Sequence, residues 1–126
     1  MSKDLILKKC RSCAAMVKVL KDCVSDDCGI RCCGEQMSVV IPNSVDAAAE
    51  KHVPQYTIQG EKIIVKVNRV MEEEHYIEWI CMVSDKKECT KYFETGDMPE
   101  TEFHYIPGST LYAYCNKHEL WKKDVE

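Results

Sequence analysis

Apolar and polar residues alternate along much of the chain beyond residue 60, a pattern typical of β-strands that bury one face. Residues 62–67 place Ile63, Val65 and Val67 on one side. Every second residue from His75 to Val83 again shares a face. Turn signals separate these runs, so an all-β fold is predicted, with an antiparallel sandwich and further strands over 89–94, 102–106 and 110–115.

The first third and the junction that follows it show shorter elements. Strands are predicted over residues 5–8, 16–20 and 38–41, with polar turns between them. Ser44 is a suitable cap for one or two helical turns over 46–49. In the predicted strand 110–115, Leu111, Ala113 and Cys115 share a face, which places the thiol of Cys115 on the apolar side.

Composition narrows the class of protein. The hydrophobic fraction is 45% and the charged fraction 30%, as in ordinary globular proteins. A net charge of -4 does not indicate a protein that binds nucleic acid or an anionic membrane. No apolar run approaches the ~20 residues of a membrane span, and no signal-peptide apolar region follows the N-terminus, so a cytoplasmic protein is predicted.

Nine cysteines are many for a cytoplasmic chain, and their spacing favours metal binding. Cys10 and Cys13 are separated by two residues, which lets both sulfurs face one ion. Cys32 and Cys33 are adjacent, and both can bind one ion only if the backbone bends sharply, which Gly34 permits. Four thiolates would form a tetrahedral iron or zinc site. The alternative is two disulfides or separate thiols.

A second group of candidate ligands lies near the C-terminus. Cys115 and His118 are three positions apart, so both side chains can reach one metal ion. Sulfur and imidazole donors suit iron or zinc rather than calcium or magnesium. His52 and His75 are each more often structural when considered alone. Together with Cys115 and His118 they form a plausible set of three nitrogens and one sulfur.

The N-terminal cysteine module resembles desulforedoxin and the N-terminal domain of desulfoferrodoxin. Both cysteine pairs match, and residues 34–37 follow the second pair as the family's Gly-Glu-x-Met does. The loop between the pairs is longer than usual and carries Cys23 and Cys28. These extra thiols could compete as ligands, form a labile disulfide or be exposed, and the last two are favoured.

The rest of the chain resembles desulfoferrodoxin, the two-iron superoxide reductase. Residues 50–54 match its Glu-Lys-His-Val-Pro motif, residues 71–80 its Met-Glu-Glu-x-His-x-Ile-Glu-Trp-Ile strand, and residues 115–121 its Cys-Asn-x-His-x-x-Trp ending; residues 96–100 also fit. The resemblance implies a desulforedoxin-like domain over 1–37 and an immunoglobulin-like β-sandwich over 38–126. A second iron would be held by the three histidines with Cys115 as axial ligand.

That resemblance also implies an activity and partners. The substrate would be superoxide, reduced at ferrous iron to hydrogen peroxide. Lys51 would attract the anion and help to deliver a proton, and Glu50 would occupy the open position in the ferric resting state. A rubredoxin-like protein would return the electron, and a homodimer is expected. Zinc is a possible substitute for iron at both sites.

One position departs from the family pattern. The family has a further histidine ligand just before the Met-Glu-Glu segment, where this chain has Arg69. His104 is the one spare histidine, on a strand that the family does not use for ligation; water or Glu72 are other candidates for the gap. Two other hypotheses therefore stay open: an electron carrier or redox sensor with a degenerate second site, and a structural zinc module. Metal analysis with visible absorption separates them, because zinc sites are colourless.

Overall fold

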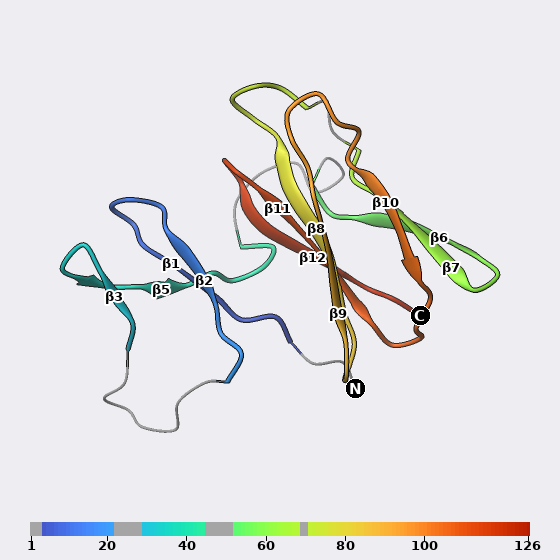
Figure 1. Ribbon diagram of the computed structural model, residues 1–126, viewed down its shortest axis with the longest axis horizontal. Helices are drawn as coiled ribbons and strands as arrows, with labels where there is room; N and C mark the ends of the chain where they lie inside the picture. Colours follow the sequence, from blue (N-terminus) through green and yellow to red (C-terminus); the bar gives the residue numbers. More distant parts are fainter. Residues whose placement is uncertain (1–3, 22–28, 45–51, 69–70) are drawn as a thin grey trace. The chain divides into compact units, whose positions relative to one another are not determined.

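The computed structural model describes residues 4–21, 29–44, 52–68 and 71–126 (Figure 1). All elements within these ranges are strands, which confirms the all-β class. None of the described segments forms a helix that could cross a membrane. The helical turns predicted over 46–49 lie outside the described residues, as do Cys23, Cys28, Glu50, Lys51 and Arg69.

The chain divides into two compact units, of which the smaller is Leu5–Ile41. One sheet has the order β2-β1-β5. Strands β3 and β4 form a separate two-stranded hairpin. The domain boundary was predicted after residue 37; β5 pairs with β1, so its residues lie with the smaller unit. The strands are β1 (Leu7–Lys9), β2 (Met16–Lys18), β3 (Arg31–Cys32), β4 (Glu35–Gln36) and β5 (Ser38–Val39).

The larger unit, which includes Pro42–Glu126, contains two antiparallel sheets. One has the order β10-β7-β6 and the other β12-β11-β8-β9 (Figure 1). Strands β6 and β12 were not predicted: β12 has two adjacent apolar residues followed by charged ones and so shows no clean alternation, whereas β6 does alternate and was overlooked. The strands are β6 (Gln55–Gln59), β7 (Lys62–Lys66), β8 (Ile77–Val83), β9 (Glu88–Tyr92), β10 (Glu100–His104), β11 (Thr110–Cys115) and β12 (Glu119–Asp124).

A single hydrophobic core joins the two sheets of this unit. Ile63 and Val65 from β7, with Val67 just beyond it, form one cluster with Leu111, Ala113 and Cys115 from β11, and all six are fully buried. The shared faces predicted for residues 62–67 and 110–115 are therefore confirmed. Placing the Cys115 thiol among these apolar side chains separates it from water.

The face predicted for residues 75–83 holds from Trp79 to Val83, whose alternate residues pair regularly with β11, but it is wrong before Trp79, because a β-bulge interrupts β8. Cys115 pairs with Ile77, but the preceding Tyr114 pairs with Trp79, so Glu78 is an extra residue in the ladder. Ile77 consequently joins the core together with Ile80 and Met82 of β8, whereas Trp79 and Cys81 do not. The bulge lies directly beside Cys115 and three residues after His75.

The core predicts a stability difference between adjacent residues of β7. We expect Ile63→Ala to lower the free energy of unfolding by about 2–5 kcal/mol, because it opens a cavity at a fully buried site. Ile64→Ala is the matched control on the opposite, half-buried face and should cost roughly half as much or less. Both tryptophans lie in the larger unit, so urea unfolding followed by tryptophan fluorescence measures this unit. Equal losses for the two variants would contradict the assigned faces.

Candidate metal centres

The four N-terminal cysteines converge in the smaller unit. The sulfurs of Cys10, Cys13, Cys32 and Cys33 all lie within 4.8 Å of one another. Cys13 Sγ is 3.6 Å from Cys32 Sγ, which is 3.9 Å from Cys33 Sγ. Cys33 and Gly34 have φ values of 55° and 77°, so the chain turns sharply where the adjacent cysteines required a bend.

Hydrogen bonds divide these thiols into different protonation states. The backbone of Cys13 lowers the pKa of Cys10 to about 7, against the opposing effect of burial. Hydrogen bonding with the Cys13 thiol raises the pKa of Cys32 to about 12 and also raises the pKa of Cys33. Without a cation, the pKa of Cys10 therefore lies well below those of Cys32 and Cys33. A bound cation must displace the protons of the thiols.

The second cluster forms in the larger unit from residues far apart in the sequence. The donor atoms of His52, His75, Cys115 and His118 lie within 4.8 Å of one another. His118 Nδ1 is 2.9 Å from His52 Nε2 and 3.1 Å from His75 Nε2. Cys115 is fully buried and His52 is only 2% exposed. Three imidazole nitrogens and a thiol that converge in this way are a donor set suited to iron or zinc.

Each of these side chains reaches the cluster from the end of a strand or a loop. Cys115 is the last residue of β11, at the bulge, and His118 lies in the turn between β11 and β12. His75 precedes β8 and forms an isolated bridge with Glu72. The hairpin of β11 and β12 thus fixes two donors, and its pairing with β8 brings in the third.

Trp121 supports the cluster in a way that the sequence did not reveal. Its indole stacks on His52 with ring centroids 5.1 Å apart, and its Nε1 donates to the carbonyl oxygen of His118 at 2.8 Å. Asn43 holds the flanks of Trp121: its N–H donates to Leu120 O, and its Oδ1 accepts from Lys122 N, both at 2.9 Å. The one sequence signal was a tryptophan three positions after His118.

The structure thus brings the eight predicted ligands together in two groups, and their role as ligands stays a prediction. His104 lies exposed on β10 and is not in the cluster. The carboxylate of Glu72 is also outside it, although its backbone pairs with His75.

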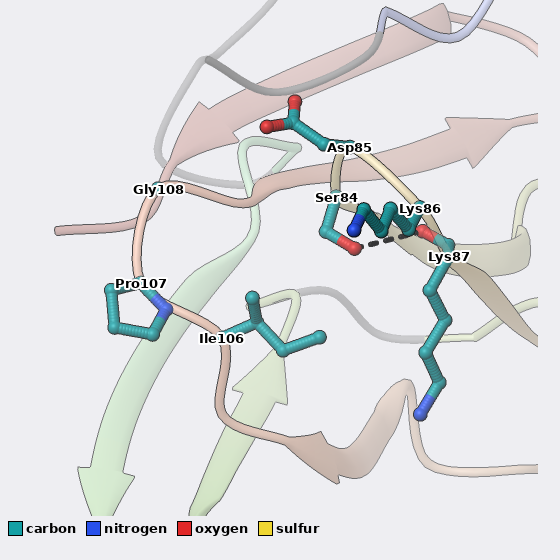
Figure 2. Close-up of a pocket in the computed structure, with 7 residues that line it drawn as sticks. All are labelled: Ser84, Asp85, Lys86, Lys87, Ile106, Pro107 and Gly108. Atoms are coloured by element: carbon teal, nitrogen blue, oxygen red, sulfur yellow. Dashed lines mark hydrogen bonds between the residues drawn. The ribbon is translucent and has the colours of Figure 1, made fainter.

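A surface pocket of about 420 Å³ lies at the far end of β8 from His75 (Figure 2). Figure 2 shows Ser84 donating to the carbonyl oxygen of Lys87, a contact of 3.2 Å that closes the turn between β8 and β9. None of the eight predicted ligands lines this pocket.

Known proteins place the chain in a family. The family model described as Desulfoferrodoxin matches residues 44–124. The chain belongs to the desulfoferrodoxin family. It is 41% identical to a desulfoferrodoxin of Clostridium acetobutylicum over 130 residues, covering 99% of this chain and 100% of that protein. It is 38% identical to a desulfoferrodoxin of Syntrophotalea carbinolica, covering 98% and 99%. The resemblance inferred from the motifs is thus confirmed.

Solved structures agree with this membership. The superoxide reductase from Treponema pallidum aligns with a TM-score of 0.72 at 26% identity, covering 96% of this chain and 99% of that chain. The one-iron superoxide reductase from Giardia intestinalis aligns with a TM-score of 0.53 at 22% identity, over 60% of this chain and 97% of that chain. This second likeness concerns the fold alone. Together with the observed strands, the first supports the fold expected for the desulfoferrodoxin family, a desulforedoxin-like domain followed by a β-sandwich.

The four-cysteine group predicts a pH dependence of metal uptake. Because the raised pKa values keep the thiols of Cys32 and Cys33 protonated at neutral pH, binding of zinc or iron should release protons. Affinity should therefore rise with pH, while the number of protons released falls as Cys10, whose pKa is lowered to about 7, loses its own proton before the ion binds. Calorimetric titration in buffers of different ionisation enthalpy measures that number. An affinity independent of pH would contradict the assigned protonation states.

Proposed function

We propose that this desulfoferrodoxin family member is a superoxide reductase that works at an iron ion held by His52, His75, His118 and Cys115. The observation that carries the proposal is the convergence of three imidazoles and one thiol within 4.8 Å in the larger unit. The solved superoxide reductase from Treponema pallidum, which aligns over nearly the whole chain, supports it. In the reaction, superoxide would take up one electron and two protons to become hydrogen peroxide.

The protein's own groups would divide the work at this centre. Bound iron would supply the one-electron chemistry. Cys115 is buried in the core cluster, so its side of the centre is closed to water. His75 and His118 are only half-buried, so the small anion would approach from the imidazole side. Trp121 would hold the ring of His52 in place by stacking.

The chain offers this centre three imidazoles rather than four. It contains four histidines, and His104 lies exposed on β10, outside the cluster. Three protein ligands suffice in many open catalytic metal sites, so we propose that iron still binds. Occupancy should be lower than in a relative with a fourth histidine, because ligand number helps to fix the ion.

Several finer features of the proposal rest on the family resemblance. Iron would also occupy the four-cysteine group, with zinc as a possible substitute at either site. Glu50 would fill the open position of the ferric centre, and Lys51 would attract superoxide and help to deliver a proton. A rubredoxin-like protein would re-reduce the iron, and the protein would act as a cytoplasmic homodimer.

A second candidate function follows from the missing histidine. Arg69 stands where the family pattern has a ligand, which favours an electron carrier or redox sensor whose working ion is the four-cysteine one. A structural zinc module would instead hold colourless zinc at both sites. Metal content and visible absorption of the purified protein separate these possibilities.

Replacement of the thiol tests the reductase directly. Cys115→Ser should abolish the thiolate-to-iron absorption of the second centre and the reaction with pulse-generated superoxide, because the sulfur donor is lost. The colour of the four-cysteine iron should persist. Cys89→Ser is the matched control, since Cys89 is a half-buried thiol of β9 outside both groups. If fully iron-loaded wild type reacts no faster than Cys115→Ser, the electron-carrier function takes its place.

The proposed role of Lys51 has its own test. Lys51→Ala should slow the second-order reaction with superoxide and flatten its dependence on ionic strength, because a local cation would no longer attract the anion. Ferrous iron should remain bound. An unchanged rate at low salt would show that Lys51 is an ordinary surface charge.

A further inference from the structure

Asn116 connects two backbone segments that carry donors of the His/Cys cluster. Its Nδ2 donates to Glu74 O at 3.0 Å, and its Oδ1 accepts from Tyr76 N at 2.9 Å. Its own N–H donates to Tyr76 O at 3.2 Å. The side-chain amide therefore bonds on both sides of His75 along the chain.

The position of Asn116 gives these bonds a geometric consequence. Asn116 directly follows Cys115 and lies two residues before His118, so its backbone is tied to both of those donors. Strand pairing between β8 and β11 ends at Ile77 and Cys115. Beyond that point the side-chain amide of Asn116 replaces a backbone peptide group: it donates one hydrogen bond and accepts one, as a peptide group of a paired strand does.

The need for such a group follows from the bulge. Because Glu78 is an extra residue in β8, the ladder is irregular just where His75 has to be aimed at the other donors. His75 also forms a local backbone bridge with Glu72, with contacts of 3.0 and 3.2 Å. That bridge is local to the loop that carries His75. The bonds of Asn116 instead connect this loop to the end of β11, the strand that ends in Cys115.

We propose that Asn116 is a positioning residue of the metal centre, which holds His75 in place relative to Cys115 and His118. The inference rests on the proposed ligand set but not on superoxide as substrate. Asn116 lies too far along the chain from His75 to be replaced by a local turn contact. Few other side chains can serve, because the role needs a donor and an acceptor on one short, planar group.

The closing experiment measures metal retention and spectrum rather than turnover. In Asn116→Ala the bonds to Glu74 O and Tyr76 N are lost; the first is exposed and the second part-buried, so water can replace the first bond readily and can reach the second through the space left by the amide. The fold should therefore persist, and tryptophan fluorescence reports this directly, because both tryptophans lie in the larger unit with Asn116. Release of ferrous ion from the His/Cys centre to a chelator should be about tenfold faster or more, the lower end for loss of a group that orients a ligand.

The ferric electron paramagnetic resonance spectrum gives a second readout. Asn116→Ala should change the signal of the His/Cys centre and leave that of the four-cysteine centre unaltered, since only the orientation of His75 is freed. Lys117→Ala is the matched control in the same turn, because this exposed side chain lies between the donors in sequence without joining the cluster. It should leave both the release rate and the spectrum unchanged.

A milder variant guards against misfolding of the alanine variant. Asn116→Asp keeps the acceptor for Tyr76 N but replaces the donor with an oxygen facing Glu74 O, so the same spectrum should change. Wild-type release and spectrum in both variants would overturn the positioning role while leaving the ligand set intact. Wild-type protein that binds a single ion, at the four cysteines alone, would overturn the ligand set itself. A protein that passes these tests but does not reduce superoxide would contradict the proposed function alone.

Discussion

The pairing of β8 with β11 is the constraint on which the His/Cys cluster depends. Its register shifts at Tyr114 and Cys115, and this shift lets Ile77 enter the core beside the Cys115 thiol. A regular continuation of the ladder from Met82 and Ile80 would have placed Glu78 on the core face instead, because strand side chains alternate with a period of two. The turn that carries His118 and the loop that carries His75 both begin where this pairing ends.

The two clusters are assembled at very different chain separations. The cysteine group draws its donors from two pairs, Cys10 with Cys13 and Cys32 with Cys33, and the second pair lies at the hairpin of β3 and β4. The second group draws donors from positions as distant as His52 and His118, so it can form only after the sandwich has folded. The entropy of closing a loop grows slowly with its length, but a long loop also needs many intermediate contacts in place. The small group should therefore assemble with less dependence on the rest of the chain.

Local patterns were enough to predict much of the fold and all the members of both clusters. Alternation identified the core faces of β7 and β11, and cysteine spacing with motif resemblance selected the eight candidate donors. The bulge at Glu78 was not predictable, because a one-residue insertion in a ladder depends on the partner strand and leaves no periodic signal. The supporting roles of Trp121 and Asn116 were missed for a similar reason: the stacking of Trp121 on His52 and the bond of Asn116 to Glu74 join segments that are remote in sequence.

Because Cys115 is buried within the core, the supply of metal should affect how long the protein survives before it is degraded. An ion bound there is attached to a side chain that packs among Ile63, Leu111 and Ile77, so it binds the folded sandwich far better than the unfolded chain. By mass action, each tenfold rise in free metal above the dissociation constant adds about 1.4 kcal/mol to the stability of the folded state. Metal-starved molecules would open more often and expose more sites to proteases. Their abundance would then follow the availability of the ion as well as the rate of synthesis.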